Sequence, residues 1–234
     1  MVQRVIEIIS PLFIPEGQLT GPLETASVFG PGRPLALEIG CGIGDFIVPM
    51  ARQQPDVNFL AIDIYNKGCL RTCRRVEAAG LENVRVMRLE ARYLLANYLP
   101  AASLSTVYVN CPDPWPKKRH RRRRLVGGDF LQHLLFSLRP GGEFLFCTDY
   151  LDYAEDVAQR LNDSGGWRNA LAVPFTTDLP EDYPRSKYMR RFLDQGKPLH
   201  FLHFRKREEV PADALRLPPI SPGFRLAWSN AANE

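Results

Sequence analysis

The chain has 234 residues, 45% of them hydrophobic and 24% charged, and 30 Lys and Arg against 26 Asp and Glu give a formal charge of +4. These are ordinary values for a globular protein, and the length fits one α/β domain. No apolar stretch approaches the roughly 20 residues that a membrane span needs, and the apolar part of the N-terminus is too short for a signal peptide. We therefore expect a cytoplasmic protein with no membrane segment.

The predicted organisation is an irregular arm over residues 1–33, one α/β domain over 34–207 and a proline-rich tail over 208–234. Within the domain, strands are expected over residues 35–39, 58–62, 84–89, 106–109 and 143–147. Helices are expected over residues 45–53, 66–79, 91–98, 128–137 and 151–161. Residues 139–142 read as a turn, and residues 165–175 and 199–205 as a closing strand pair around a long loop. This alternation predicts a mostly parallel sheet with helices on both faces and all parallel strands ending at one rim.

The cysteines are few and scattered along the chain, at positions 41, 69, 73, 111 and 147. An odd number without paired spacing indicates free thiols in a reducing compartment. Cys69 and Cys73 share a predicted helix face, but no His or second Cys pair completes a zinc site. We expect no metal.

The segment NCPDPWPKKRHRRRR, residues 110–124, carries the strongest functional signal. It follows a strand and holds Asp113 and Trp115 in a proline-stiffened turn, and seven of the eight residues 117–124 are Lys or Arg. Without these seven, 23 cations stand against 26 acids, so the positive charge is concentrated at one turn. An acid, an aromatic ring and a basic block at the end of a strand predict chemistry on a nucleic acid base. The alternative is a solvated basic loop or a localisation signal.

The loop Gly40-Cys41-Gly42-Ile43-Gly44 departs from the dinucleotide fingerprint, because Asp45 stands where the third glycine is needed. Glu38, at the end of the strand before the loop, would repel a pyrophosphate and favours a cationic ligand without phosphate. S-adenosylmethionine is such a ligand. Asp63 and Glu90 end the next two strands, where they are placed to receive the ribose hydroxyls and the adenine amino group. No Arg or Lys stands directly beside these three acids, although each singly also suits a helix cap or a loop salt bridge.

Several segments occur in the order found in the bacterial tRNA (guanine-N7-)-methyltransferase family of the TrmB type: LEIGCGIG, AIDI, RLEA, CPDPWPKKRHRRRR, CTDYLDYAE and RSKYMRRFLDQGKPLHFLHFRK. The chain resembles this family from about Phe13 to Lys206. The resemblance implies a Rossmann-like class I methyltransferase fold with a seven-stranded sheet. It also implies methyl transfer from S-adenosylmethionine to N7 of a guanine in the variable loop of tRNA. We expect a monomer or homodimer.

Site residues follow from the resemblance position by position. The methyl donor would be bound by Glu38, Gly40, Asp63, Glu90 and Asp113. Asp113 would also be the catalytic residue. The tRNA substrate would be contacted by Lys117, Asp149, Ser186, Lys187, Tyr188 and Met189. The family has Thr-x-x-Glu where this chain has Ser186-Lys187-Tyr188-Met189, so guanine recognition is expected to weaken unless Glu181 or Asp182 compensates.

The chemistry demands little of a general base, because guanine N7 already presents a lone pair. The enzyme mainly positions N7 against the donor methyl group, and Asp113 either stabilises the positive charge formed on the purine or anchors the donor. Trp115 is a stacking surface for a base or a packed turn residue, and Asp149 contacts substrate or caps the following helix. His120 is expected to contact phosphate.

Two other functions remain open at this point. One is a class I methyltransferase that acts on another RNA base or on a small molecule. An enzyme for a small molecule would not need the basic run. The other is a tRNA-binding homologue with reduced activity because Met189 replaces the family glutamate.

Overall fold

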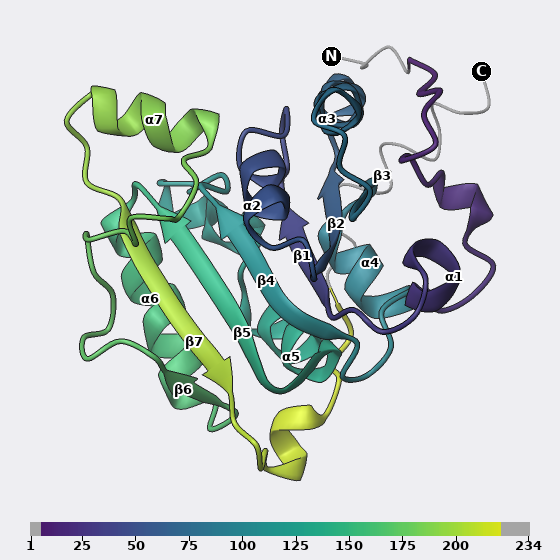
Figure 1. Ribbon diagram of the computed structural model, residues 1–234. Coiled ribbons are helices and arrows are strands. Elements are labelled where there is room, and N and C mark those ends of the chain that lie inside the picture. The colour runs from purple at the N-terminus through teal and green to yellow at the C-terminus, as the bar shows by residue number, and fades with distance from the viewer. Residues whose placement is uncertain (1–5, 221–234) are drawn as a thin grey trace. The chain divides into compact units, whose positions relative to one another are not determined.

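The computed structural model describes residues 6–220, which divide into two compact units. Unit 1 holds the described residues up to Pro100 together with Ile220, and unit 2 runs from Ala101 to Pro219. The seven strands belong to one sheet in the order β3-β2-β1-β4-β5-β7-β6 (Figure 1). The predicted α/β class and the mostly parallel sheet are therefore confirmed. The expected boundaries of arm, domain and tail stay predictions, and the tail beyond residue 220 lies outside the described residues.

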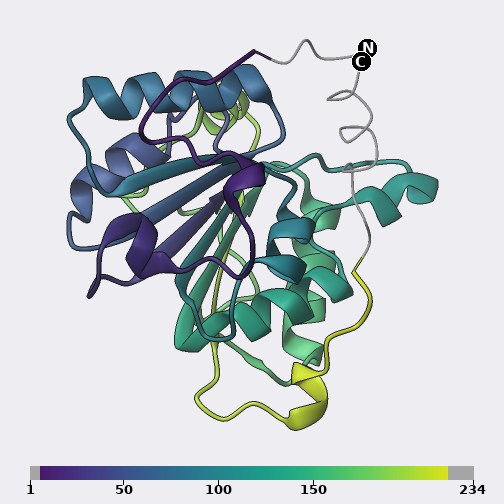
Figure 2. The same ribbon diagram turned by 90° about the vertical axis from the view of Figure 1, so that its right-hand side faces the viewer.

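Unit 1 contributes three parallel strands, and its elements are η1 (Glu16–Gln18), α1 (Thr25–Phe29), β1 (Leu35–Ile39), α2 (Ile47–Gln53), β2 (Asn58–Asp63), α3 (Asn66–Ala78), β3 (Val84–Arg88) and α4 (Ala91–Asn97). All five residues of β1 are buried, as expected of a parallel strand covered on both faces. Helix α3 is seen side on in Figure 2 and packs against β2 and β3. Its inner face carries Cys69, Cys73 and Val76 at helical spacing, and all three are fully buried.

Unit 2 contributes the other four strands, and its elements are β4 (Leu104–Asn110), η2 (Lys118–Arg123), α5 (Gly128–Ser137), β5 (Leu138–Thr148), α6 (Leu151–Asp163), β6 (Trp167–Asn169), α7 (Lys187–Asp194), β7 (His200–Lys206) and η3 (Ala212–Leu215). Strands β4 and β5 are parallel, whereas β7 runs antiparallel to both β5 and β6. Aromatic side chains fill the core of this unit. The rings of Phe146 and Tyr153 meet edge to face at 5.1 Å between β5 and α6.

Three sequence predictions in unit 2 are wrong. Residues 139–142 do not form a turn before a strand, because β5 runs through them and absorbs the extra residues as a bulge between its pairings with Leu104 and Thr106. The expected strand over 165–175 is only Trp167–Asn169. The expected long loop contains the helix α7, which Ser186 caps and after which Gly196 adopts a positive φ of 68°. A capping serine and a terminal glycine are the local signals that could have revealed this helix.

Within residues 6–220, no helix is long and apolar enough to cross a membrane. The same part of the chain contains no cluster of three or more His, Cys, Asp or Glu side chains suited to a metal ion. All five cysteines are free thiols, and all but Cys111 are buried.

Candidate functional site

The predicted donor residues of unit 1 share one edge of its sheet. In the parallel register, Glu38 of β1 lies opposite Ala61 of β2, and Asp63 of β2 lies opposite Arg88 of β3. Glu90 follows β3 after one residue. The sequence prediction that three acids stand at the carboxyl ends of neighbouring strands is thus confirmed for unit 1. This edge is where open α/β sheets bind their ligands.

The glycine loop is a tight backbone turn held by the end of β2. The amides of Gly40 and Cys41 both donate to the carbonyl oxygen of Ile62, at 2.8 and 3.0 Å. Gly40 has a φ of +84°, a conformation that favours glycine, and no heavy atom of the described residues lies within 4 Å of the place where its Cβ would stand. The backbone at Gly40 therefore faces open space, which leaves room for a ligand to approach closely.

Glu38 is a buried carboxylate with spare acceptor capacity. Its side chain is 1% exposed, and its Oε2 atom has no hydrogen-bond partner within the described part of the chain. Burial, followed by the charges of Asp63 and Asp45, raises the pKa of Glu38 well above the ordinary value. An orphaned buried oxygen is costly unless a ligand donor satisfies it. The residue therefore suits a ligand that brings an ammonium or another strong donor.

Asp63 joins the glycine loop to the start of α3. Its Oδ2 atom accepts from the amide of Gly42 at 2.8 Å, and its Oδ1 atom accepts from the amide of Tyr65 at 2.8 Å. Burial raises its pKa, against the lowering effect of these backbone hydrogen bonds. Each carboxylate oxygen keeps a second lone pair, so Asp63 can brace the loop and still accept from a ligand hydroxyl.

Glu90 has a buried partner that the sequence does not reveal. No Arg or Lys is directly beside Glu90 in the sequence, but in the fold Arg92 Nη1 lies 3.0 Å from Glu90 Oε1 and both side chains are buried, so the salt bridge that the sequence left as an alternative is present. The Oε2 atom of Glu90 also caps α4 by accepting from the amide of Tyr93 at 3.1 Å. Burial raises the pKa of Glu90, while Arg92 and the backbone amides oppose that rise. Glu90 thus has the capping role that the sequence left open, and its contact with a donor stays a prediction.

In unit 2, Asp113 stands in an irregular turn directly after β4. Cys111 and Trp115 flank it with positive φ angles of 50° and 43°, unusual for residues with a side chain. The amide of Cys111 donates to Cys147 of the neighbouring strand at 2.8 Å, which anchors the start of the turn. The Asp113 side chain is exposed and is therefore available to a substrate.

Trp115 is half-buried under two members of the basic run. The His120 ring meets it edge to face at 5.8 Å, and the Arg123 guanidinium lies 5.0 Å from its centre. Trp115 therefore organises the basic run through ring and cation contacts. Its role as a stacking surface for a base stays a prediction.

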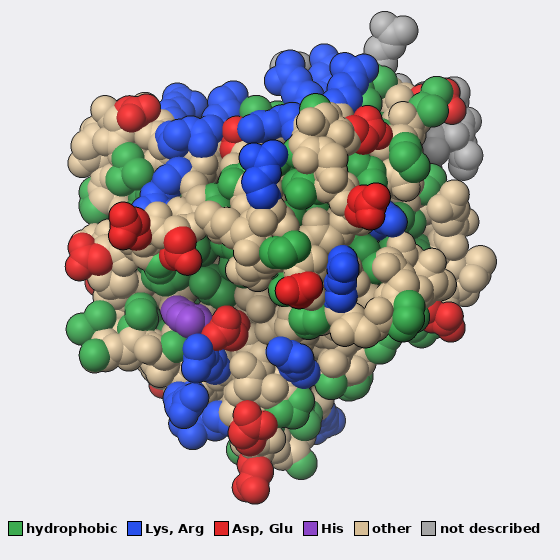
Figure 3. Space-filling model, in the orientation of Figure 1, with side chains coloured by type: hydrophobic (Ala, Val, Ile, Leu, Met, Phe, Trp, Pro, Cys, Tyr) green, Lys and Arg blue, Asp and Glu red, His purple; other side chains and the backbone are tan. Residues whose placement is uncertain are grey.

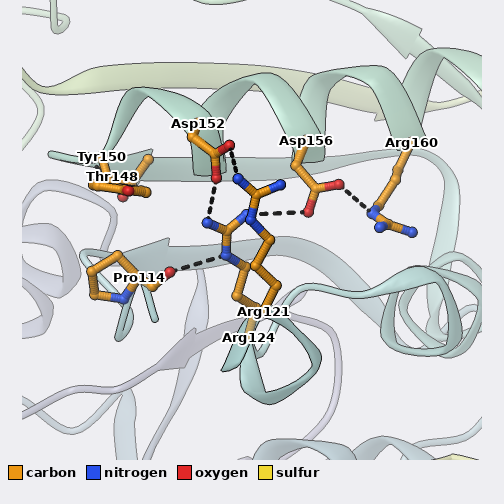
Figure 4. Close-up of polar contacts among 8 residues, drawn as sticks. All are labelled: Pro114, Arg121, Arg124, Thr148, Tyr150, Asp152, Asp156 and Arg160. Atoms are coloured by element: carbon orange, nitrogen blue, oxygen red, sulfur yellow. Dashed lines mark hydrogen bonds and ion pairs between the residues drawn. The ribbon is translucent and has the colours of Figure 1, made fainter. Parts of the chain in front are cut away.

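The basic run itself is not uniformly available to phosphate. Arg124 is 3% exposed, and its guanidinium binds Pro114 O at 2.9 Å, Asp152 and Asp156 (Figure 4). It also lies 4.6 Å from the ring centre of Tyr153. Arg121 pairs with the same Asp152. The expectation that the basic block holds a polyanion therefore does not extend to buried Arg124, and it is weakened for Arg121, because acids of α6 pair with both side chains.

The remaining cations of the run are exposed. Lys117 precedes the short helix η2 as its N-cap residue, and the exposed side chains within that helix are Lys118, Arg119, Arg121, Arg122 and Arg123. Since Arg121 is paired, the side chains that remain to meet a polyanion are those of Lys117, Lys118, Arg119, Arg122 and Arg123.

Asp149 lies at the end of β5 and is held by Lys197, whose Nζ atom is 3.4 Å from Asp149 Oδ2. The alternative that Asp149 caps α6 is wrong, because the N-cap residue of α6 is Tyr150 and no side chain in the described part of the chain caps this helix. Lys197 also lies 4.9 Å from the ring centre of Phe192 in α7. Asp149 is thereby linked to α7, the helix whose N-cap and first turn form the predicted substrate segment Ser186–Met189.

Ser186 and Met189 form the N-terminal cap of α7. The Ser186 hydroxyl accepts from the amide of Met189 at 3.3 Å, and the Met189 sulfur accepts from the amide of Ser186 at 3.4 Å. Spacing and contacts are those of a capping box. Met189 is fully buried, whereas Lys187 and Tyr188 are exposed. Of the four predicted substrate residues here, Lys187 and Tyr188 present the most surface.

Comparison with known proteins identifies close relatives. The family model described as "Putative methyltransferase" matches residues 32–202. The tRNA (guanine-N(7)-)-methyltransferase of Syntrophotalea carbinolica is 55% identical over 229 residues, 98% of this chain and 98% of the relative. Its namesake from Geobacter metallireducens is 50% identical over 211 residues, 90% of this chain and 100% of the relative.

Solved structures resemble the chain at lower identity. The 16S rRNA methyltransferase KamB matches with a TM-score of 0.57 and 18% identity, over 74% of this chain and 88% of that one. An antibiotic-related methyltransferase matches with a TM-score of 0.55 and 18% identity, over 81% of this chain and 97% of that one. These likenesses concern the fold alone and confirm the predicted class I methyltransferase fold.

Proposed function

Because the chain belongs to the tRNA (guanine-N7-)-methyltransferase family, we propose that it transfers a methyl group from S-adenosylmethionine to N7 of a guanine in the variable loop of tRNA. The relatives that carry this activity in their names align over nearly the full length of the chain. A reaction on tRNA places the enzyme in the bacterial cytoplasm. We retain the expectation of a monomer or homodimer.

The observation that carries the donor assignment is the Oε2 atom of buried Glu38, which has no partner among residues 6–220, beside an open glycine loop. S-adenosylmethionine supplies the methyl group and brings an ammonium and a sulfonium, which suit a buried carboxylate. In the proposal, Glu38 and the backbone at Gly40 hold the methionine part of the donor. Asp63 accepts from the ribose hydroxyls with the lone pairs that its bonds to Gly42 and Tyr65 leave, and Glu90 lies toward the adenine.

On the substrate side, Asp113 is the proposed catalytic residue and also contacts the donor. N7 needs no deprotonation, so the Asp113 carboxylate acts by orienting the reactants and by stabilising the positive charge that methylation leaves on the purine. Lys117 and the exposed cations that follow it neutralise phosphates. Asp149, held by Lys197, and the exposed part of Ser186–Met189 contact the tRNA.

Methylation of an unmodified tRNA transcript tests the proposal. We expect 7-methylguanosine in the nucleoside digest, mapped to one variable-loop guanine, and loss of the product when that guanine is replaced by adenine. Asp113→Asn should lower kcat with little change in tRNA affinity. Methylation of a different nucleoside would favour another RNA methyltransferase. Tight tRNA binding without any product would favour the binding homologue, and weak tRNA binding a small-molecule enzyme.

Donor binding is tested separately by calorimetry on the tRNA-free protein. Asp63→Ala removes both the proposed ribose acceptor and the braces to Gly42 and Tyr65, and we expect donor affinity to fall by at least about tenfold, the value of one net hydrogen bond to a charged group. Asp56→Ala, a change of another acid in the same unit, is the matched control. Unaltered donor affinity in Asp63→Ala would contradict the assignment.

A further inference from the structure

A second group of cations lies on α3, outside the basic run of residues 117–124. Lys67, Arg71, Arg74 and Arg75 are all exposed, and Figure 3 shows Lys and Arg side chains gathered over α3 at the top of the view. Their spacing in the sequence is helical, and the residues between them form the buried face of the helix. The sequence suggested that the positive charge is concentrated at one turn. The structure shows exposed cations on α3 as well.

The cations of α3 stand three or four residues apart, and like charges at these spacings repel one another. Lys67 and Arg71 are four residues apart and Arg71 and Arg74 three apart, so their side chains are neighbours on one face of the helix. Like charges at these spacings destabilise a helix by a few tenths of a kcal/mol per pair. Arg75 is partly relieved by Asp45, 2.7 Å away. Within residues 6–220, Lys67, Arg71 and Arg74 have no hydrogen bond or ion pair through their side chains.

Helix α3 is firmly seated against the glycine loop through its opposite face. A Cβ on Gly68 would stand 2.4 Å from the carbonyl oxygen of Gly42, and one on Gly44 would stand 3.3 Å from Thr72. The Thr72 hydroxyl donates to Gly42 O at 3.2 Å, and Arg75 donates to Ile43 O at 3.1 Å. The exposed cations thus belong to a helix, α3, that cannot move away from the glycine loop without breaking these contacts.

We infer that Lys67, Arg71 and Arg74 form a second phosphate-binding surface, which takes the backbone of the tRNA substrate. The inference rests on the proposed function for the identity of the polyanion. With a rise of about 1.5 Å per residue, the stripe from Lys67 to Arg74 extends about 10 Å along the helix, the rise of about three nucleotides of a duplex strand. An extended row of cations suits a phosphate backbone, whose negative charges repeat along a line.

The test compares two variants of equal charge. Lys67→Gln, Arg71→Gln and Arg74→Gln are combined in one variant, since Gln keeps the helix propensity. Arg33→Gln, Arg52→Gln and Arg168→Gln are combined in the control, which removes three other exposed cations. Arg75 is left unchanged because it braces the glycine loop. Affinity for unmodified tRNA is measured between about 50 and 200 mM salt, and donor affinity is measured without tRNA.

We expect the α3 variant to lose nearly one unit of salt slope for each phosphate contact. For three contacts, the wild-type protein should lose about 40-fold more affinity than the α3 variant between about 50 and 200 mM salt. The control should keep the wild-type slope, and both variants should keep wild-type donor affinity. Equal slopes in the α3 variant and the wild type would overturn the inference. If the wild type binds tRNA with this slope yet forms no 7-methylguanosine, the proposed function fails while the α3 surface stands; if the wild type does not bind tRNA, both fail.

Discussion

The Nε atom of Arg124 donates a hydrogen bond to the carbonyl oxygen of Pro114, 2.9 Å away, and so ties the end of the basic run to the turn that holds Asp113. The same guanidinium is bound by Asp152 and Asp156 of α6 (Figure 4). Arg124 therefore connects the start of α6 with the residue next to the proposed catalytic carboxylate. It is a positioning residue, because its side chain is only 2% exposed and leaves no surface for phosphate.

We predict that Arg124→Lys lowers kcat for tRNA methylation by about tenfold or more while KM for tRNA changes little, since a misplaced reacting group is costly. Lysine keeps the charge but cannot bind Pro114 and both acids with one planar fork. Arg124→Ala should also lower the free energy of unfolding by about 2 kcal/mol, the scale of a lost hydrogen bond to a charged group. Arg122→Lys is the matched control. A rise in KM with unchanged kcat would mean that Arg124 contacts tRNA instead.

The exposed part of the basic run should show the opposite behaviour. Lys118→Ser combined with Arg122→Ser removes two exposed cations that have no ion pair among the described residues. We expect the salt slope of tRNA binding to fall by about two units, one for each lost phosphate contact, with unchanged donor affinity. An unchanged slope would show that these side chains do not meet the phosphates.

The Glu38 side chain should lower the stability of the donor-free protein and strengthen donor binding. Because its pKa is raised in the folded protein, the folded state holds the proton more tightly than the unfolded chain, and stability falls as the pH rises above the ordinary value of 4.5. Glu38→Gln should therefore raise the melting temperature of the donor-free protein at neutral pH, by roughly 3 °C per kcal/mol gained. This gain in melting temperature should vanish when the pH falls below the ordinary pKa of 4.5. The same variant should bind the donor more weakly.

Glu143 provides a control of opposite sign. The His203 ring, 3.2 Å from Oε1, and then Arg205 lower the pKa of Glu143 against the effect of burial. Its stabilising effect is present above the unfolded pKa and is lost as the pH falls through the folded one. Glu143→Gln should lower the melting temperature at neutral pH and leave donor affinity unchanged. A stability change of the same sign in both variants would contradict the assigned pKa directions.

The capping box of α7 yields a prediction about the departure at Met189. A carboxamide accepts a hydrogen bond more strongly than a thioether, so Met189→Gln should stabilise the first turn of α7, whereas Met189→Leu should loosen it. Ser186→Ala should cost about 1 kcal/mol. Hydrogen exchange at the amides of α7 measures these effects. If methylation follows the protection of α7 across the three variants, position 189 acts through the helix; if Met189→Glu alone raises methylation, position 189 reads the guanine.

The sequence by itself determined the elements whose signals are local. The buried run of β1, the glycine loop after it and the acids at the strand ends are visible as residue patterns, because parallel strands need continuous apolar runs and tight turns need glycine. The family motifs likewise lie in contiguous segments, and so the reaction class follows from the residue order alone. The serine that caps α7 is a local signal of the same kind, although by itself it does not reveal the helix.

Only the tertiary structure decided which charges are free. Arg124 and Asp152 are 28 residues apart in the sequence, and nothing in the run Lys117–Arg124 distinguishes the one buried arginine from its exposed neighbours. The sequence likewise does not reveal that Glu90 pairs with Arg92. The two side chains become buried partners only in the folded chain, at the start of α4. A count along the chain treats every cation as solvated, whereas folding brings acids from another helix to some of them and none to Lys67, Arg71 and Arg74 within the described residues. Burial and pairing are properties of three-dimensional neighbours, and they decide whether a charge holds the protein together or meets the RNA.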